Sequence, residues 1–430
     1  MHRIVVIGGG AGGLELATQL GDRLGARGRA HVTLVDRSRT HLWKPLLHEV
    51  AAGSMDIHAH QLDYLAQARW HHFTFVLGAL EGLERQARHV RLAAVRDDEG
   101  TEILPPRRIP YDTLVIAIGS ESNDFGTPGV RDNAFTIDNA WQAHLFHRRL
   151  VNACFRANFA ADGRVLRIAI VGAGATGVEL AAELHNTLRV LSAYGLDHFH
   201  PERQIHIALV EAGPRLLPGL PEYIAKETRR TLDALGVEVL VDQRVVEVGP
   251  GSLKTASGRE LPADFTVWAA GIRCADVLRN LDGLESNRIN QLVVTATLQA
   301  TRDADIFAMG DCAAAPWSAE RNVPPRAQAA HQESSHLVPS LDRRLRGLEP
   351  RPFRYRDFGS LVSLGNYQSV GTLMGFATGG TLRLEGLLAK LFYLSLYRMH
   401  VWALHGFWRM ALDTLARAIR SQTDPKVKLH

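Results

Sequence analysis

One strand–turn–helix pattern occurs twice in this chain, and it constrains the possible folds more than any other feature. Residues 3–20 and 167–184, which begin 164 positions apart, are identical at 10 of 18 positions. Each copy runs from a short β-branched segment into a G-x-G-x-x-G frame, formed by Gly8, Gly10 and Gly13 and by Gly172, Gly174 and Gly177. The first glycine permits a tight turn, the second lets a pyrophosphate approach the backbone, and the third allows close helix packing. The duplication predicts two dinucleotide-binding sites.

Each copy is followed by a second strand that ends in an acidic residue. We expect these strands at His31–Val35 and His206–Val210, with Asp36 and Glu211 directly after them. A carboxylate at this place can accept a hydrogen bond from an adenosine ribose hydroxyl, while the helix that starts near Gly12 directs its N–H groups at the pyrophosphate. A 2′-phosphate would meet like charge at Glu211, so we expect NADH to be preferred over NADPH.

Length and composition indicate a globular protein of two or three domains. The chain has 430 residues, of which 46% are hydrophobic and 22% charged, and this composition argues against disorder. We expect two Rossmann-like dinucleotide-binding domains and a C-terminal region that associates with a membrane. The strand at 304–311 ends in Gly310-Asp311 and returns the chain to the first domain, where Asp311 can reach ribityl hydroxyls. The expected divisions are 1–122 with 300–342, then 123–299, then 343–430.

Weaker patterns fill the intervening segments. Residues 73–79, 89–95 and 102–109 are expected to form an antiparallel meander, followed by a buried strand at 112–119. We also expect a helix at about 326–341, since Pro324-Pro325 precedes it, and its first N–H groups would face a flavin.

Cysteine usage and hydropathy exclude several classes of protein. Cys154, Cys274 and Cys312 lie far apart without a C-x-x-C pair, so neither a disulfide framework nor a zinc cluster is expected. The first strand begins at Arg3, which leaves no room for a leader segment. No uncharged apolar run approaches the ~18 to 20 residues of a spanning helix. We therefore expect a reducing compartment and no segment that crosses a bilayer.

Positive charge is concentrated at the C-terminus. Residues 381–430 contain 8 Lys/Arg and 3 Asp/Glu, a net of +5, whereas the whole chain has a net charge of +4. From 387 to 420 the charged or polar positions fall on one helical stripe: Arg398, His405, Arg409, Asp413, Arg417 and Arg420. Large apolar residues cover the other faces, so we expect a helix that lies in the interface of an anionic lipid surface. A core helix or a dimer contact would have the same pattern.

The helix expected at 326–341 carries the most specific motif. Ala327-Gln328-Ala329-Ala330-His331-Gln332 resembles the A-Q-x-A-x-Q quinone-site signature of the type II NADH:quinone oxidoreductases, which are two-domain flavoproteins. Gln328 and Gln332 are i and i+4, so both amides share one face, although a polar stripe on a solvated helix would do the same. The likeness covers nearly the whole chain and is closest to the gammaproteobacterial enzyme in 41–56, 359–364 and 426–430.

The resemblance implies roles for individual residues. Those implied to line FAD are Gly8, Gly9, Gly10, Ala11, Gly12, Gly13, Asp36, Lys44, Ala79, Asp311 and Ala327. Those implied to hold NADH are Gly172, Gly174, Gly177, Glu211 and Gly271. Glu179 is implied to act near the nicotinamide and the quinone, and Gln328, Gln332 and Lys390 are implied to act at the quinone. Because Glu15 stands where Glu179 does in the other copy, a shared helix-surface acid remains an alternative, as does a solvated lysine for Lys390. His331, Cys274 and Cys312 are interpreted as structural.

The resemblance also implies the reaction: hydride transfer from NADH to FAD, then two-electron reduction of membrane quinone without proton pumping. It implies a peripheral, monotopic enzyme on the cytoplasmic face of the inner membrane, possibly a homodimer, with no nucleic-acid partner and no metal. A sulfide:quinone oxidoreductase or a disulfide reductase would need a cysteine pair near the flavin. A flavin-dependent redox sensor would not need the second nucleotide site.

Overall fold

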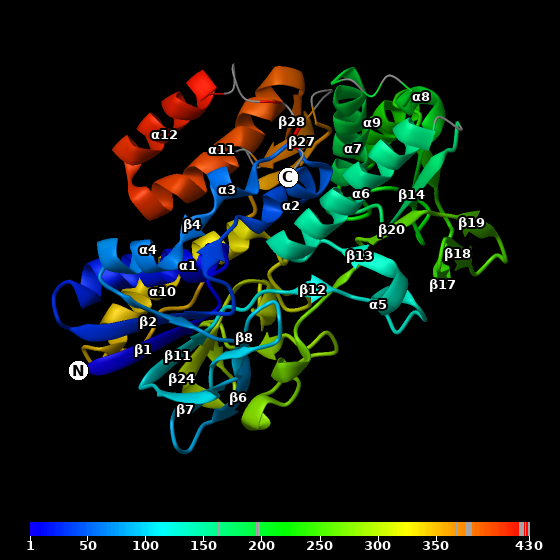
Figure 1. Ribbon diagram of the computed structural model, residues 1–430. Helices are drawn as coiled ribbons and strands as arrows, with labels where there is room; N and C mark the ends of the chain where they lie inside the picture. The colour runs from blue at the N-terminus through cyan, green and yellow to red at the C-terminus, as the bar shows by residue number, and fades with distance from the viewer. Residues whose placement is uncertain are drawn as a thin grey trace.

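The computed structural model describes residues 1–160, 163–194, 196, 198–365, 369–374, 381–420, 425 and 427–428. Within these ranges the side chains of 369–374, 381–391, 393–394, 418 and 420 are not described. Two separate parallel sheets dominate the molecule, one at the lower left of Figure 1 and the other at its right.

The first sheet is built around the first glycine-rich copy. Its six strands have the order β23-β24-β11-β1-β2-β5, with β1 (His2–Ile7) and β2 (Ala30–Asp36) parallel and in register from His2 opposite Ala30 to Ile7 opposite Val35. β11 (Thr113–Ile116), β24 (Asp303–Ala308) and β5 (Thr74–Leu77) are also parallel to their neighbours, whereas β23 (Gln299–Ala300) is antiparallel. The helices α1 (Ala11–Leu20) and α10 (Ala327–Arg344) pack against each other beside this sheet.

The second sheet repeats the arrangement. Its order is β13-β20-β14-β15-β16, and all four pairings are parallel. β14 (Leu166–Val171) leads into α7 (Ala175–Ala193), and β15 (Ile205–Val210) precedes Glu211. Other elements of this unit include α6 (Ala140–Ala160), α9 (Glu222–Ala234), β13 (Ala134–Thr136), β16 (Glu238–Leu240) and β20 (Phe265–Trp268). A separate antiparallel sheet has the order β17-β18-β19, with β17 (Val245–Gly249), β18 (Ser252–Thr255) and β19 (Glu260–Pro262). The α/β class with two Rossmann-like units is thus confirmed.

The expected meander is wrong in its first strand. β5, within 73–79, pairs with β2 as the parallel edge of the first sheet. The expectation fails because a short apolar run specifies a strand but not its partner. The antiparallel sheet consists instead of β6 (Leu80–Glu84), β7 (His89–Leu92) and β10 (Arg107–Pro110), in the order β10-β7-β6, and β8 (Val95–Arg96) pairs with β9 (Glu102–Leu104) as a separate hairpin.

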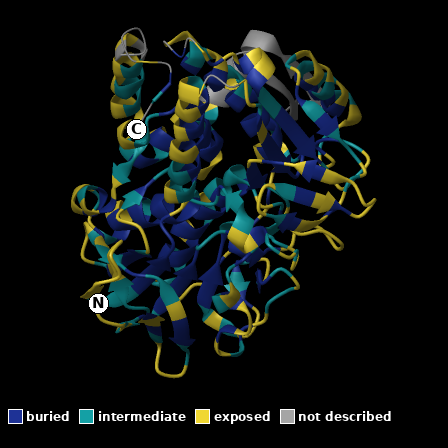
Figure 2. Ribbon diagram, turned by 45° about the vertical axis from the view of Figure 1, so that its right-hand side comes forward, coloured by how far each residue is buried: buried dark blue, intermediate teal, exposed yellow. Residues whose placement is uncertain are grey.

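The chain also returns to the first unit earlier than residue 299. Cys274, Leu278, Leu281, Leu284 and Leu292 belong to the same apolar core as β1 and β11. β22 (Leu292–Val293) pairs with β25 (Ala313–Ala314), and β21 (Ile272–Arg273) pairs with β12 (Glu121–Ser122). Two connections, at β12 and β21, therefore join the units. Figure 2 shows the buried residues concentrated in the two sheets.

The C-terminal region covers the junction of the two units. It contains the sheet β26 (Gly359–Ser363), β27 (Ser369–Met374) and β28 (Thr381–Glu385), followed by α11 (Gly386–His405) and α12 (Phe407–Arg420). The expected single polar stripe is interrupted, since Gly406 has φ +78° and separates the two helices. Both helices lie above α1 and α4 (Tyr64–Trp70) in Figure 1. Among the described residues, no helix is long and apolar enough to span a membrane.

Candidate active site

The first glycine-rich loop uses its glycines for different purposes. Gly8 has φ +102°, a conformation that favours glycine, and a Cβ on Gly13 would lie 1.9 Å from the Gly8 carbonyl oxygen. A Cβ on Gly12 would meet Met309 and Ala330, so Gly12 serves the contact between α1 and α10. A Cβ on Gly10 would meet nothing within 4 Å. Gly10 is therefore the position at which a pyrophosphate can approach.

Asp36 braces the same loop from the end of β2. One of its carboxylate oxygens accepts from the Gly9 amide at 2.6 Å, and the other accepts from the Ser38 amide at 2.7 Å. Burial raises the pKa of Asp36, while these amides oppose the shift. The Asp36 carboxylate thus fixes the loop as well as standing at the position of a ribose acceptor.

The second loop has the same construction. Gly172 has φ +104°, a Cβ on Gly177 would lie 2.0 Å from the Gly172 carbonyl oxygen, and a Cβ on Gly174 would meet nothing within 4 Å. Glu211 accepts from the Ala173 and Gly213 amides, each at 2.8 Å. Each loop therefore has one glycine with open space beside it and one carboxylate that accepts hydrogen bonds from the amides of the loop.

Three residues from separate segments meet beside the first loop. The Ser120 hydroxyl donates to Asp311 at 2.6 Å, and the Lys44 ammonium donates to the Ser120 carbonyl oxygen at 2.6 Å. Gly119, which precedes Ser120, has φ +73° and open space where a Cβ would lie. The arrangement places an acid, a hydroxyl and a cation around a glycine that a ligand can approach. The serine carried no motif signal in the sequence.

The two glutamines of α10 share one face, as their spacing predicts, and both bind the segment before β26. Gln332 pairs with Arg356, accepting from its amide at 3.0 Å and donating to its carbonyl oxygen at 2.9 Å. Gln328 donates to the Gly359 carbonyl oxygen at 3.0 Å and to Asp357 at 3.3 Å. Among the described residues, Gln332 therefore has one N–H that is not engaged. Arg326, the N-cap of α10, makes no side-chain cap.

Glu179 on α7 lies in a cluster of buried acids. It accepts from the Ser363 amide of β26 at 3.0 Å and lies 3.6 Å from Nδ1 of His48. Burial raises the pKa of Glu179 to about 8, and the neighbouring charges of Glu49 and Glu183 add to the shift. Burial lowers the pKa of His48 to about 4. A neutral carboxyl group beside a neutral imidazole can hold or release a proton near neutral pH.

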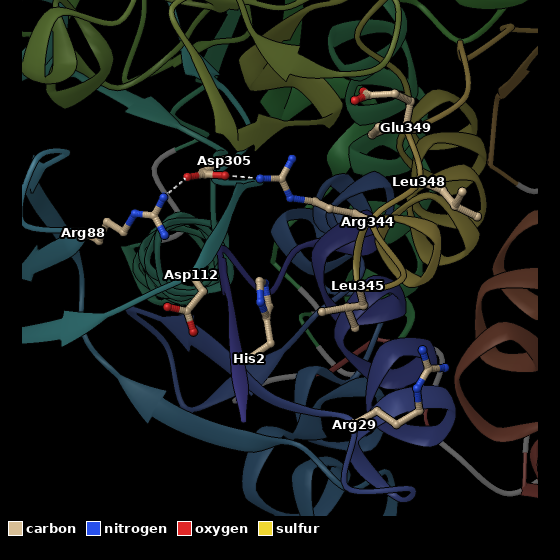
Figure 3. Close-up of a pocket in the computed structure, with 11 residues that line it drawn as sticks. His2, Arg29, Arg88, Asp112, Asp305, Arg344, Leu345, Leu348 and Glu349 are labelled. Carbon is tan, nitrogen blue, oxygen red and sulfur yellow. Dashed lines mark hydrogen bonds and ion pairs between the residues drawn. The ribbon is translucent and has the colours of Figure 1, made fainter.

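A cavity of about 650 Å³ lies elsewhere. Figure 3 shows Asp305 between Arg88 and Arg344, with His2 and Asp112 nearby. His2 begins β1 and Asp305 lies near the start of β24, so the cavity is at the amino ends of the strands. Nucleotides bind outside the carboxyl ends of parallel strands. This cavity is consequently not the nucleotide site.

The chain matches known proteins over its whole length. Residues 2–334 match the family model described as pyridine nucleotide-disulphide oxidoreductase. The type II NADH:quinone oxidoreductase of Haemophilus influenzae is 44% identical over 100% of both chains, and that of Staphylococcus aureus strain NCTC 8325 is 30% identical over 88% of this chain and 91% of its own. The chain belongs to the type II NADH:quinone oxidoreductases. Like them it is a flavoenzyme that uses FAD and NADH.

Solved structures agree on the fold. NDH2 of Plasmodium falciparum in complex with NADH has a TM-score of 0.82 at 18% identity, covering 99% of this chain and 100% of that chain. The sulfide:quinone oxidoreductase of Aquifex aeolicus has a TM-score of 0.74 at 18% identity, covering 94% and 91%. The fold alone therefore does not separate these two activities.

Cysteine chemistry separates this type II enzyme from the disulfide-using relatives. All three cysteines are free and buried. Cys312 donates to the carbonyl oxygens of Ile116 and Met309, and burial raises its pKa to about 12. Burial likewise raises the pKa of Cys274, which donates to the Asp311 carbonyl oxygen. The thiols of Cys274 and Cys312 are therefore both held in buried positions by hydrogen bonds to backbone carbonyl oxygens.

The other residues that the resemblance implies for the site lie in different surroundings. A Cβ on Gly271 would lie 2.4 Å from the Phe125 ring, so this glycine allows Phe125 to cover it. The Ala79 carbonyl oxygen accepts from the Ala93 amide. Ala11 and Ala327 are the first residues of α1 and α10. Lys390 lies in α11, but its side chain is outside the described residues, as are Lys426, Leu429 and His430.

Sequence reasoning missed the partners of Glu15. A helix-surface acid was one alternative for this position, but Glu15 is 2% exposed and accepts from Nδ1 of His331 and of His400, each at 2.7 Å. His400 in turn contacts His41. Histidines occur in the segments that pack around the first loop. Because these segments are distant in sequence, the sequence alone does not show that the histidines meet.

Proposed function

We propose that this chain binds FAD at the first glycine-rich loop, oxidises NADH bound at the second, and reduces a membrane quinone. The observation that carries the proposal is that Gly10 and Gly174, the two positions facing a pyrophosphate, are open, while Gly13 and Gly177 are closed by backbone. Full-length similarity to enzymes named NADH:quinone oxidoreductase supports the substrates.

The residues around the first loop fit a bound flavin. Gly8–Gly13 and Asp36 would hold the adenosine half, and Lys44, Ser120 and Asp311 offer hydrogen bonds for the ribityl chain. The FAD would accept a hydride from NADH and pass two electrons to quinone. The protein supplies position and electrostatics. The unengaged N-terminus of α10 adds positive dipole potential beside this site.

We assign NADH binding to Gly172, Gly174, Gly177, Glu211 and Gly271. Glu211 would accept a hydrogen bond from a ribose hydroxyl. A 2′-phosphate would be repelled by the Glu211 charge, so an unphosphorylated ribose is favoured. Gln332 would donate its remaining N–H to a quinone carbonyl, with Gln328 holding the neighbouring segment in place. Glu179 would hold a proton between the nicotinamide and quinone positions, since its carboxyl group is kept neutral by burial.

Attachment to a membrane surface fits the outward face of α12. Trp408, Leu412, Leu415 and Ile419 are 60% to 78% exposed and recur at steps of four, three and four. The opposite side of α12 packs on protein, with Arg409 over the Trp70 ring and Arg417 over the Tyr397 ring. A helix with its apolar face outward suits the interface of a bilayer. We place this surface on the cytoplasmic face of the inner membrane; a homodimer is a second possible use of the same face.

Purified protein would test the function directly. The flavin absorbance should bleach with NADH and recover when a soluble quinone is added, and turnover should continue while both substrates last. Bleaching by sulfide instead of NADH would indicate a sulfide:quinone oxidoreductase. A single bleaching step without sustained turnover would indicate a sensor.

A further inference from the structure

A buried chain of polar groups connects the first glycine-rich loop with α11 and α10. Nδ1 of His41 lies 2.9 Å from the Gly9 carbonyl oxygen, and Nε2 of His41 lies 2.9 Å from Nε2 of His400. Nδ1 of His400 lies 2.7 Å from one Glu15 oxygen, and Nδ1 of His331 lies 2.7 Å from the other. His41, His400 and Glu15 are each less than 5% exposed.

Counting hydrogens shows that this series of hydrogen bonds contains one proton more than two neutral imidazoles and a carboxylate would supply. Three contacts, Gly9 with His41, His41 with His400, and His400 with Glu15, each need one hydrogen between the two heavy atoms. Two neutral imidazoles carry only one N–H each. Because the Gly9 carbonyl oxygen can only accept, Nδ1 of His41 must donate. The third hydrogen must therefore reside on the Glu15 carboxyl group or make one imidazole cationic.

The surroundings decide where the additional proton resides. Burial, with the nearby charge of His400, lowers the pKa of His41 to about 3, so His41 is neutral. Burial also tends to raise the pKa of Glu15, but the hydrogen bonds from His331 and His400 lower it by more. Glu15 is then a carboxylate that accepts from both imidazoles, and the hydrogen count places the third hydrogen on the His400 ring, which lies between His41 and Glu15.

Other groups around the chain do not supply this proton. Tyr64 on α4 donates to the Gly9 carbonyl oxygen at 2.7 Å, and burial raises its pKa well above the usual value. Trp43 stacks on His400 with ring centroids 5.9 Å apart. His405, the next histidine on α11, contacts Gln67 at 3.3 Å, and burial lowers its pKa. Asp36 is engaged by the Gly9 and Ser38 amides.

His331 stands at one end of this series of hydrogen bonds, and it is the member that can exchange protons. Its side chain is 30% exposed, and its Nδ1 donates to Glu15, which leaves Nε2 to gain and lose a proton. The hydrogen bond that His331 donates to Glu15 raises the pKa of His331. His331 is three residues after Gln328 and one before Gln332, so it adjoins the glutamine face of α10. A carboxylate that orients an imidazole in this way is the arrangement used in acid–base catalysis.

The overall reaction requires such a group. NADH gives one hydrogen nucleus and two electrons as hydride, whereas quinone needs two protons and two electrons to become quinol. One further proton must come from the protein or solvent. We propose that His331 delivers this proton from Nε2 to the quinone oxygen, that Glu15 positions it, and that the His400 and His41 pair fixes the charge of Glu15. Solvent then returns a proton to Nε2. The inference rests on the proposed quinone reductase function.

NMR on the full-length protein tests the proton count without reference to turnover. With ¹⁵N-labelled histidine, one buried imidazole should show an N–H on both ring nitrogens, and His400→Asn should remove that signal. His331 should titrate above the ordinary value, and Glu15→Gln should lower its midpoint. Finding no persistent imidazolium, or no effect of Glu15→Gln on His331, would overturn the assignment.

Rapid mixing tests the role of His331, which is partly exposed and tolerates substitution more readily than Glu15. His331→Asn keeps an N–H for Glu15 but cannot titrate. We expect reduction by NADH at the wild-type rate, reoxidation by quinone slowed at least ~10-fold, and loss of the pH dependence of reoxidation. His336→Gln, on the same helix, is the matched control. Unchanged reoxidation in His331→Asn would refute the inference, whereas a wild-type protein that does not reduce quinone would refute the proposed function itself.

Discussion

Glu15 and Glu179 occupy the same position in the two repeated helices, two residues after the third glycine of each loop, and each binds the C-terminal region. Glu15 accepts from His400 of α11, and Glu179 accepts from the Ser363 amide of β26. Their pKa values shift in opposite directions. Burial raises the pKa of Glu179, and two neighbouring acids add to the shift, whereas for Glu15 the hydrogen bonds from two imidazoles outweigh burial and lower the pKa. The same position of the repeat therefore provides an ionised group in one domain and a neutral carboxyl group in the other.

The acid cluster predicts a pH-dependent stability. Burial raises the pKa of both Glu49 and Glu179 from 4.5 to about 8, so the folded state binds protons that the unfolded state releases. Stability from these groups is complete below about pH 4.5 and is lost as the pH rises through about 8. The melting temperature should fall over this range, and Glu49→Gln should reduce the slope.

Control variants make this measurement specific. Glu320→Gln, at an exposed position, should leave the slope unchanged. Glu333, whose pKa burial also raises to about 8, should maintain part of the slope in Glu49→Gln. A melting temperature that rose from pH 5 to 8 in the wild type would contradict the assignment of neutral acids.

The first loop predicts different outcomes for two neighbouring glycines. Gly10→Ala should change the free energy of unfolding by no more than ~0.5 kcal/mol, since a Cβ there meets nothing and φ is −62°, yet FAD should no longer be retained. Gly13→Ala should destabilise the fold by ~1 to 3 kcal/mol or more, because its Cβ would collide with the Gly8 carbonyl oxygen. Chemical denaturation and flavin content after purification measure both. Retention of FAD by Gly10→Ala would remove Gly10 from the pyrophosphate position.

Much of the fold follows from local sequence. The strand, glycine turn and helix of each copy are specified within about 20 residues, and β2, β15 and α10 begin and end within three residues of the expected positions. The strand at 73–79 was misassigned because a short apolar run does not reveal whether its neighbour is parallel or antiparallel. Likewise, nothing local places Cys274–Leu292 in the first core, since that depends on tertiary packing.

The residues of the candidate site likewise fall into two groups: those that a local motif identifies and those that only tertiary packing brings together. Gly10, Gly174, Asp36 and Glu211 carry their own motif, so sequence finds them. His400 makes contact with His41 across 359 residues of chain and with Glu15 across 385, and each residue alone is an ordinary polar residue. Only the packing of α11 on α1 brings them together. Gln328 and Gln332 were placed on the correct face, but their bonds to the 356–359 segment required the tertiary structure.

Glu211 predicts the nucleotide preference. Glu211→Gln removes the charge that would repel a 2′-phosphate, so the ratio of kcat/KM for NADH over NADPH should fall by ~10-fold or more. The amide group can still accept from Ala173, which limits disturbance of the loop. Asp36→Asn, at the equivalent position of the first loop, should weaken FAD retention but leave this ratio unchanged. An unaltered ratio in Glu211→Gln would exclude the residue as the determinant.

Gln332 predicts an effect confined to one half-reaction. Gln332→Leu removes the remaining N–H and both bonds to Arg356, so reoxidation by quinone should slow by ~10-fold or more. Reduction by NADH should be unaffected, because Glu211 and the second loop belong to the other domain. Stopped-flow absorbance separates the two steps. If reduction by NADH slowed and reoxidation did not, Gln332 would have to act on the nicotinamide side.

The outward face of α12 predicts how the protein reaches a quinone that resides in a bilayer. Truncating the chain before α11 would also remove His400 and its contact with Glu15, so substitutions on α12 alone are the sharper test. Leu412 and Leu415 are 65% and 60% exposed, so replacing both by glutamine should leave the fold intact. Each leucine that enters the lipid interface contributes up to ~1.5 to 3 kcal/mol, and the double variant should bind anionic liposomes ~10- to 100-fold more weakly in a flotation assay. Leu348→Gln, which alters an exposed leucine at the cavity of Figure 3, is the matched control and should float like the wild type. Turnover with a short-chain soluble quinone should be preserved in the double variant, since α12 does not contribute to the glycine-rich loops. Equal flotation of the double variant and the wild type would show that α12 serves another contact, and a change from dimer to monomer in the same variant would identify that contact as the homodimer.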